Sequence, residues 1–428
     1  MMGKTGILFF ILIHFYAYLS AQERLDTLQV SSKEAQRIFL DNNLSIIAER
    51  LHIDQADALI LQAKAWPNPN LSIDEINFNR NETSEKIPPL IGNFGRNQQF
   101  TAQVEQLILT ARKRKKNIQL ETSNREMAKN TFLDLLQSLK VEFKSALSEL
   151  VYQQHLKNDL IFQNELVDKL LKAQSSQLKL GSISRADFLR IKALKVTVNA
   201  DLNNVEAQIQ ESQSNIKTLM AVPSTTYLLI QENEEDMNID GLEQLSIQNL
   251  LDAAIDHNIQ LKIAANSKDL STNQLAIERA KRVPDITLNL NYDRAGSTMF
   301  NFFGAGIAMD IPLFDRNKGN IKYAMYEIQK NDLQLEEKKL QVKNQVVEKF
   351  QNMQHTLQLL DQIDKDYINE LQQVQTALAD HFIKRNLSLL EFLDRFNSFK
   401  ENKQLYYQTL RDIQIKQYEL NYLTGREL

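Results

Sequence analysis

Apolar side chains recur at alternating spacings of four and three residues along three long stretches of the chain. This spacing is typical of a coiled-coil seam rather than of a broad globular helix face. Any single position in it is more simply explained as ordinary core, so the inference depends on length and period together. The seam positions are Phe132, Leu136, Leu139, Phe143, Ala146 and Leu150; then Met353, Leu357, Leu360, Tyr367, Leu371, Val374 and Leu378; then Phe392, Phe396, Phe399, Tyr406, Leu410 and Ile413.

Glycine and proline, which usually interrupt helices, are absent from the spans that carry these seams. Neither residue occurs between Lys113 and Leu180 or between Asn320 and Thr424. A helix from about Arg114 to Leu180 would be roughly 100 Å long at 1.5 Å per residue. We therefore expect a mainly α fold in which long antiparallel coiled-coil helices fold back as hairpins.

Four shorter segments instead alternate between apolar and polar residues and predict β-strands. They are 70–78, 99–109, 285–292 and 302–313. In the third, Ile286, Leu288 and Leu290 alternate with polar residues, and Gly304 and Gly306 stand near the start of the fourth. Such segments fit a membrane barrel with an aqueous lumen, although a half-buried soluble sheet gives the same pattern. The aromatic residues Phe300, Phe302 and Phe303 fit either a girdle at the lipid boundary or the cap of a hairpin.

The two halves of the chain repeat one unit of about 200 residues. We divide the chain into a signal peptide (1–21), a first repeat (22–223), a linker or equatorial segment (224–246) and a second repeat (247–428). Each repeat is expected to run helix, β-hairpin, long helix, return helix. The corresponding residues are Asn43 and Asn258, Pro67 and Pro284, Arg112 and Arg316, Asp187 and Glu391, and Leu219 and Leu423.

The N-terminus predicts export from the cytoplasm. Lys4 precedes an apolar run from Gly6 to Leu19 that is too short to span a bilayer, and Ala21 provides a small residue for cleavage. The mature chain is expected to begin near Gln22. Since the sequence contains no cysteine, a lipid anchor at the cleavage site and disulfides are excluded.

No later stretch approaches 18 consecutive apolar residues, so any crossing of a membrane would be made by strands. Four strands are too few to close a barrel, and an open edge in lipid is costly. Three copies would give twelve strands around an aqueous lumen, which predicts a homotrimer. The hairpin loops at 80–96 and 294–301 would then face the cell exterior, and the helices would lie in the periplasm.

Composition narrows the function classes further. A net charge of −4 provides no basic field for nucleic acid. The six histidines are scattered, and no nucleophile motif, glycine-rich phosphate loop, metal motif or cofactor motif is present, so we expect no enzyme and no cofactor. A periplasmic adaptor or a coiled-coil scaffold without a membrane barrel is the alternative, but neither has reason to duplicate strand pairs between long helices.

Taken together, these motifs resemble the TolC-type outer membrane efflux factor family over essentially the whole mature chain. The resemblance is carried by the helix end from Ala63 to Asn70, by its duplicate at Pro284, by the strand exit from Asp310 to Phe314 and by the turn from Leu180 to Ser184. The asymmetric Pro67-Asn68-Pro69 is most similar to the cation-efflux branch.

The resemblance implies a channel-tunnel in the outer membrane, with its helical part in the periplasm. Such a channel docks a periplasmic adaptor (membrane fusion protein) and an inner membrane pump and performs no catalysis. The resemblance also places acidic residues around a periplasmic aperture at the hairpin tips, here Asp187, Glu391 and Asp394. Alternatively, Glu391 and Asp394 only stabilise the first turn of their helix.

Two further groups follow from the same resemblance. The hairpin tips are expected to contain Gly181, Ser182, Ser184, Asn386 and Ser388, with Asn386 in the left-handed conformation where the family usually has glycine. The strand and helix junctions are expected at Pro67, Pro69, Pro284 and Pro312. The basic run 112–116 follows the second strand, where it faces lipid headgroups or simply begins a solvated helix.

Overall fold

The computed structural model describes residues 26–76, 90–92, 99–231, 239, 241–295, 299–363 and 365–428. The predicted signal peptide and most of the predicted loop at 80–96 lie outside these residues. The chain divides into two compact units. Unit 1 comprises Met1–Ala48, Leu135–Asn258 and Val342–Leu428, and unit 2 comprises Glu49–Asp134 and Ile259–Gln341. None of the described helices is both long and apolar enough to cross a lipid bilayer.

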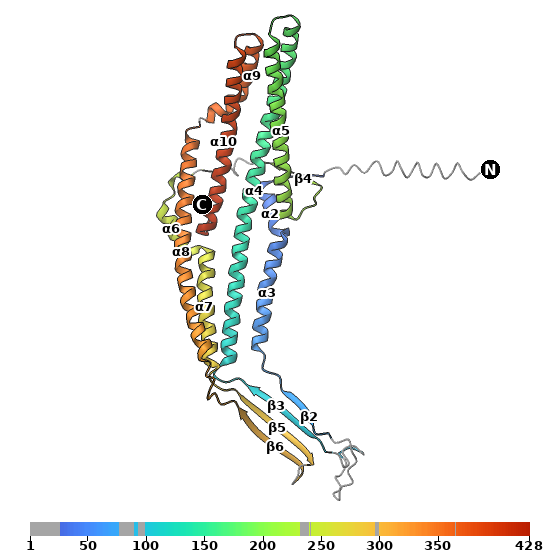
Figure 1. Cartoon of the computed structure of the whole chain (residues 1–428), viewed down its shortest axis with the longest axis vertical. Coiled ribbons are helices and arrows are strands. Elements are labelled where there is room, and N and C mark those ends of the chain that lie inside the picture. The colour runs from blue at the N-terminus through green and yellow to red at the C-terminus, as the bar shows by residue number, and fades with distance from the viewer. Residues whose placement is uncertain are drawn as a thin grey trace, which may run out of the picture. The chain divides into compact units, whose positions relative to one another are not determined.

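Long helices dominate the chain, and six short strands accompany them (Figure 1). The helices are α2 (Ser32–Asn42), α3 (Leu44–Lys64), α4 (Lys113–Lys179), α5 (Arg185–Met220), η2 (Leu242–Gln244), α6 (Ile247–His257), α7 (Ile259–Ala280), α8 (Lys318–Asp361), α9 (Lys365–Ile383) and α10 (Leu389–Thr424). The strands are β1 (Asp26–Ser31), β2 (Asn70–Asp74), β3 (Thr101–Ile108), β4 (Thr226–Gln231), β5 (Ile286–Ala295) and β6 (Phe300–Met309). The predicted mainly α class with a small β part is confirmed.

The first long helix agrees with the prediction within one residue at each end, since α4 runs unbroken for 67 residues. The prediction was wrong for its counterpart in the second half, where the helix breaks between α8 and α9. Gln362 N–H donates to Leu359 at 3.2 Å and Ile363 N–H donates to Leu360 at 2.9 Å. These three-residue bonds tighten the last turn and end α8 without any glycine or proline.

Unit 2 contains a four-stranded antiparallel sheet in the order β2-β3-β5-β6. The polar positions of β5 face glycines of β6: Asn289 pairs with Gly306, and Asn291 pairs with Gly304. A Cβ at Gly304 or Gly306 would lie only 2.2 or 2.3 Å from the neighbouring asparagine Oδ1. A side chain at either position would therefore require the neighbouring asparagine side chain to move, whereas glycine leaves that space to the asparagine.

Several strand boundaries differ from the prediction. β3 begins at Thr101 rather than at residue 99, and β5 continues to Ala295 rather than ending at residue 292. β2 ends at Asp74 rather than continuing to Phe78, which itself lies outside the described residues. β6 occupies Phe300–Met309 rather than 302–313. The shift at the end of β6 has a local cause, because Pro312 has no N–H to donate to a strand ladder.

Unit 1 contains a second, two-stranded sheet that the sequence reasoning did not predict. β1 and β4 pair in parallel from Asp26 opposite Thr226 to Ser31 opposite Gln231. The buried Gln213 of α5 fixes β4, because its side chain donates to the Leu228 carbonyl and accepts from the Leu228 N–H, each at 2.9 Å. β4 lies inside the segment that we assigned as a linker.

Two buried asparagines make equivalent contacts in the two halves of the chain, as the internal repeat predicts. Asn43 ends α2, and its Nδ2 donates to the Leu219 carbonyl at 2.9 Å; Asn258 ends α6, and its Nδ2 donates to the Leu423 carbonyl at 2.9 Å. The order α2-α3-β2-β3-α4-α5 recurs as α6-α7-β5-β6-α8-α9-α10. The compact units cut across both halves, and the repeat boundaries at 223 and 246 stay a prediction.

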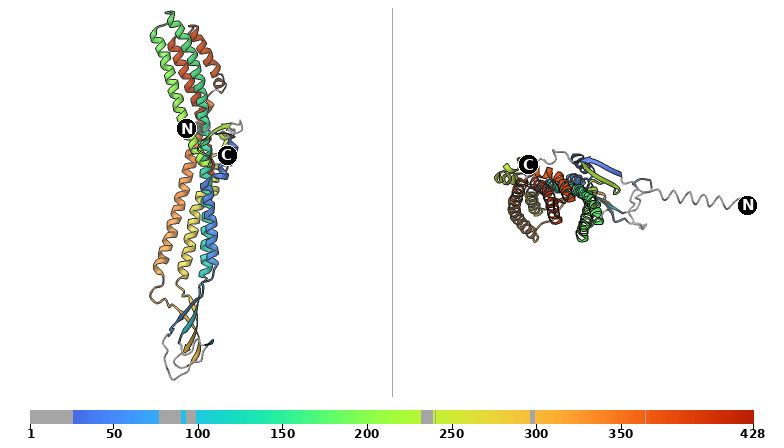
Figure 2. Two further views of the ribbon diagram at one scale, coloured as in Figure 1. Left: turned by 90° about the vertical axis from the view of Figure 1, so that its right-hand side faces the viewer. Right: turned by 90° about the horizontal axis from the view of Figure 1, so that it is seen from above.

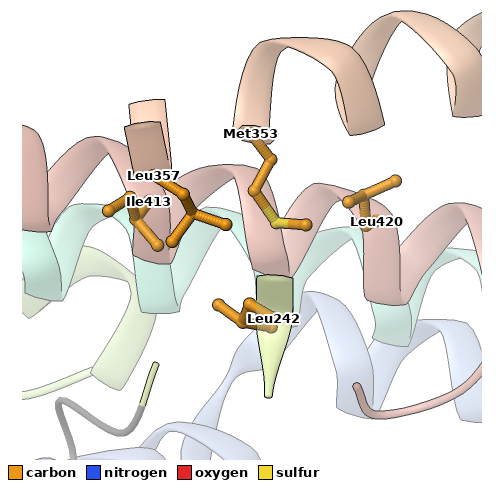
Figure 3. Close-up of a cluster of buried hydrophobic side chains, with 5 residues drawn as sticks. All are labelled: Leu242, Met353, Leu357, Ile413 and Leu420. Atoms are coloured by element: carbon orange, nitrogen blue, oxygen red, sulfur yellow. The ribbon is translucent and has the colours of Figure 1, made fainter. Parts of the chain in front are cut away.

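The core of unit 1 follows much of the predicted seam. Leu242 of η2 packs with Met353, Leu357, Ile413 and Leu420 in one buried cluster (Figure 3). Seam positions buried elsewhere in unit 1 are Phe143, Leu150, Leu371, Leu378, Phe392 and Phe396. Val374 is wrong as a core position, because its side chain is exposed and the adjacent Gln375 is buried instead. The side chain of Tyr367 lies outside the described residues.

Candidate functional site

The two hairpin tips of unit 1 have the same backbone design. Between α4 and α5, Gly181 is left-handed (φ 67°) and Ser182 N–H donates to the Gln177 carbonyl at 2.9 Å. Between α9 and α10, Arg385 is left-handed (φ 64°) and Asn386 N–H donates to the His381 carbonyl at 2.9 Å. Both are helix ends of the Schellman type. The expectation for Asn386 was wrong by one residue, since Arg385 occupies the position of the glycine.

Side-chain bonds hold the two tips against each other. Arg385 Nη2 donates to the Ser182 carbonyl at 3.2 Å, and Gln177 Nε2 donates to the Ile383 carbonyl at 3.2 Å. The tips lie side by side in the views of Figures 1 and 2. Arg385 therefore combines an unfavourable backbone conformation with a contact that only a long donor side chain provides.

The acidic residues predicted for the aperture lie in the first turns of α5 and α10. Ser184 Oγ donates to Asp187 Oδ2 at 2.7 Å and accepts from the Asp187 N–H at 3.0 Å. Ser388 forms a full capping box with Glu391, whose carboxylate accepts from the Ser388 N–H at 3.0 Å and from its Oγ at 2.8 Å. Asp394 is exposed one turn further along α10.

Electrostatics at Glu391 follow from this cap. The hydrogen bonds from the backbone and the side chain of Ser388 hold the pKa of Glu391 below its ordinary value, and the positive charge of Arg395 acts in the same direction. Within one protomer, Glu391 and Asp187 thus already have a structural role, which the alternative interpretation expected for Glu391. Their role at an aperture stays a prediction, because it needs further copies of the chain.

In unit 2, the strand and helix junctions are fixed by buried or half-buried polar contacts. Asp285 precedes β5 and accepts from the Lys113 ammonium and from the Thr110 N–H, each at 2.8 Å. In the second repeat, Asn317 Nδ2 donates to the Glu278 carbonyl at 2.8 Å and to its Oε2 at 2.7 Å. The segment after β3 is thereby bonded to the start of β5, and the segment after β6 is bonded to the end of α7.

The predicted proline positions all lie at these junctions. Pro67 and Pro69 stand between α3 and β2, Pro284 precedes β5, and Pro312 follows β6. Two prolines also take part in bonding through their carbonyls: Pro67 accepts from Gln106 Nε2 at 2.9 Å, and Pro284 accepts from Thr110 Oγ1 at 2.5 Å. A residue without an N–H is suited to these places, where the chain leaves one ladder of hydrogen bonds for another.

Sequence reasoning missed a band of ion pairs in the helices of unit 1. Lys403 pairs with Asp159, Lys400 pairs with Asp201, and Arg411 Nη1 contacts Glu149 at 2.9 Å. Burial raises the pKa of Asp159, although Lys403 opposes this change. All of these ion-paired residues except Lys403 line a cavity of 340 Å³ among α4, α5 and α10. The signal was available in the sequence, because polar residues interrupt the seam of α4 after Leu150.

Comparison with known proteins gives two sequence matches. Residues 250–425 match the family model described as "Outer membrane efflux protein". The cobalt-zinc-cadmium resistance protein CzcC of Cupriavidus metallidurans is 24% identical over 293 residues, which cover 68% of this chain and 64% of CzcC. The aligned region thus spans slightly less than two thirds of that relative.

Solved structures resemble the whole fold at low sequence identity. The outer membrane protein VceC of Vibrio cholerae has a TM-score of 0.71 at 14% identity, covering 92% of this chain and 96% of VceC. The CmeC outer membrane channel of Campylobacter jejuni has a TM-score of 0.72 at 10% identity, covering 94% of this chain and 86% of CmeC. These findings confirm the resemblance that the order of the motifs indicated.

Proposed function

Since this chain resembles the TolC-type outer membrane efflux factors in motif order, sequence and fold, we propose that it is the outer membrane channel-tunnel of a tripartite efflux system. It conducts passively, and an inner membrane pump supplies its substrate through a periplasmic adaptor. Residues 1–21 direct export and are removed, and the mature chain carries no lipid. The helices occupy the periplasm.

The open edges of the sheet in unit 2 are the observation that carries this proposal. Among the described residues, β2 and β6 each pair with one strand only, so the sheet has two free edges. Its apolar face is uncovered in the single chain: Leu290 is 62% exposed and Ile307 is 69% exposed. A lipid-facing sheet cannot leave backbone donors and acceptors unpaired. Three copies joined edge to edge form a closed barrel of twelve strands.

The name of one relative supports a cargo class. CzcC is called a cobalt-zinc-cadmium resistance protein. We assign metal cations to this chain as the first cargo to test. Three copies of Asp187, Glu391 and Asp394 would form rings of carboxylates at the periplasmic aperture. Such rings attract cations and repel one another unless cations or basic groups bridge them.

Cell fractionation followed by gel electrophoresis of unboiled samples tests the placement and the assembly together. We expect an outer membrane protein that migrates as a trimer unboiled and as a monomer after boiling. A soluble periplasmic monomer would instead support the adaptor or scaffold alternative and remove the channel.

Growth of a deletion strain tests the cargo. We expect reduced growth on cobalt, zinc or cadmium salts, restored by the wild-type gene, with antibiotic sensitivity unchanged. Unchanged growth on these metal salts together with increased antibiotic sensitivity would leave the channel function standing and would show that its cargo is not a metal cation.

A further inference from the structure

Basic residues concentrate where the sheet of unit 2 meets its helices. Four segments make these connections: 61–69, 109–116, 279–285 and 310–322. Together they contain twelve basic and three acidic residues, in a chain whose net charge is −4. We call them the junction belt. They lie at one end of the sheet, because Ile286 pairs with both Ile108 and Met309. Figure 1 shows the strands meeting α3, α4, α7 and α8 at this end.

Only a few of these basic residues have structural tasks. Lys113 binds Asp285 and also donates to the Val283 carbonyl at 2.7 Å. Arg114 donates to the Lys64 carbonyl, and its guanidinium lies 4.8 Å from the centre of the Trp66 ring. Most of the others are exposed, and their side chains form no hydrogen bond or ion pair within the described part of the chain; they are Arg112, Lys115, Arg279, Arg282, Arg316 and Lys318.

Basic residues at these places do not stabilise the helices that begin there. The first turns of α4 and α8 contain basic residues and no acidic residue. Positive side chains at the start of a helix are repelled by the positive end of its dipole and by one another. Because the same sign recurs at both starts, the charges are better explained by a negative partner outside the chain than by helix stability.

Exposed apolar side chains accompany the charges. Trp66 is 63% exposed and Phe314 is fully exposed, and Ile311 and Leu313 are also exposed between β6 and α8. Indole and phenyl rings beside lysine and arginine are typical of the boundary between lipid chains and headgroups. The apolar face of the sheet adjoins the belt, through Leu71 on β2 for example. An acidic soluble peptide would account for the charges but not for this continuity.

We propose that the junction belt binds anionic phospholipid headgroups of the membrane leaflet on the helical side of the sheet. This inference rests on the proposed function, because it assumes that the sheet is embedded in a bilayer. Each exposed lysine or arginine near an anionic membrane surface adds attraction, and salt screens it. The belt would thus fix the depth of the sheet in the membrane and collect anionic lipid around it.

Trp66 makes the belt directly observable, because it is the only tryptophan in the sequence. The full chain is reconstituted in phosphatidylcholine bilayers that contain either brominated phosphatidylcholine or brominated phosphatidylglycerol, and quenching of the Trp66 fluorescence is measured. We expect brominated phosphatidylglycerol to quench at a mole fraction at least about threefold lower than brominated phosphatidylcholine, and high salt to reduce this preference.

A charge-removing variant and a matched control locate the effect. The variant combines Arg112→Gln, Lys115→Gln, Arg282→Gln and Arg316→Gln, and we expect it to lose the preference for phosphatidylglycerol. The control removes four exposed lysines outside the belt, with Lys169→Gln, Lys192→Gln, Lys262→Gln and Lys343→Gln, and should keep it. Replacing Arg112, Arg282 and Arg316 by lysine should also keep it, because the charge is retained.

The outcomes separate this inference from the function on which it rests. Equal quenching by the two lipids in the wild type would overturn the belt as an anionic site and leave the membrane placement intact. Equal loss of preference in the control variant would also overturn it. The absence of quenching by either lipid would remove the belt and the membrane placement together.

Discussion

At the scale of single residues, the two hairpin tips have the same backbone conformation but different residues at the left-handed position. Gly181 and Arg385 occupy equivalent left-handed positions, but only the arginine reaches the Ser182 carbonyl of the other tip. A left-handed conformation costs a residue with a Cβ roughly 1–2 kcal/mol, and an exposed hydrogen bond returns about 0.5–1.5 kcal/mol. The two effects are of similar size, so Arg385 is tolerated at little net cost.

Substitutions of Arg385 separate these effects. Arg385→Ala keeps the strained backbone and loses the bond, whereas Arg385→Gly loses the bond and relieves the strain. We expect the glycine variant to protect the amides of 381–388 from hydrogen exchange about fivefold better than the alanine variant, which corresponds to about 1 kcal/mol. Gly181→Ala should weaken protection at the first tip. Equal exchange in the two Arg385 variants would contradict the assignment of strain.

Substitutions of Glu391 distinguish a cap from an aperture charge. Glutamine preserves a capping box but has no charge, so Glu391→Gln with Asp394→Asn should lower cation selectivity in bilayer conductance while the helix start stays folded. Glu391→Ala should instead weaken the first turn of α10, because the carboxylate that accepts from the Ser388 N–H is removed. Unchanged selectivity in the first variant would leave Glu391 as a cap alone.

The lowered pKa of Glu391 also predicts a pH dependence. Because its folded-state pKa lies below the ordinary value of 4.5, its stabilisation is complete above that value and is lost as the pH falls through the folded pKa. Hydrogen exchange of the first turn of α10, compared between about pH 6 and about pH 3, should show this loss in the wild type. Glu391→Gln should lack it, because glutamine does not titrate.

At the scale of elements, the sequence predicted what local patterns determine. A seam of apolar residues without glycine or proline sufficed for α4, and duplicated prolines located the strand junctions. The break after Asp361 was not predictable, because it carries no glycine or proline and is made by a tightened last turn. β1 and β4 were missed for a different reason: they pair across almost 200 residues, and their partner is not visible in either segment alone.

The candidate site was predictable to the same extent. The family resemblance placed Asp187 and Glu391 at the hairpin tips, and the structure adds that Ser184 and Ser388 cap the helices on which they lie. The left-handed residue at the second tip was assigned to Asn386, because asparagine tolerates that conformation well, and the long-range contact of Arg385 was not visible in the sequence. For the half-buried ion pairs around Asp159, the sequence shows only that polar residues interrupt the seam of α4, and the choice of partners depends on the packing of three distant helices.

The buried asparagines give an element-scale prediction. Each ties the corner between two helices to the end of a third, so Asn258→Ala leaves the Leu423 carbonyl without this donor. We expect a loss of about 1–3 kcal/mol, seen as a lower temperature at which the trimer band disappears on unboiled gels. Asn43→Ala should behave alike, and the exposed neighbour Asn42→Ala should have little effect. If Asn258→Ala left this temperature unchanged, the hydrogen bond of Asn258 would have no structural role.

At the scale of the whole molecule, period-two alternation in β5 would determine which side chains face lipid in the proposed channel. Leu290→Lys introduces a charge on the exposed apolar face, which costs about 2–4 kcal/mol near the bilayer midplane and recurs in each of three copies. We expect less heat-modifiable trimer in the outer membrane fraction. Thr287→Lys lies on the opposite face and should assemble normally. Equal assembly of both variants would place the sheet outside the bilayer.

The free edges of β2 and β6 also have a genetic consequence. In the proposed trimer, each subunit would join one edge strand to each of the two other subunits, so one defective copy would impair an assembly whose other copies are normal. A defective allele expressed together with the wild-type allele would therefore inactivate a larger fraction of the assemblies than its fraction of the expressed chains, and the defect would be dominant.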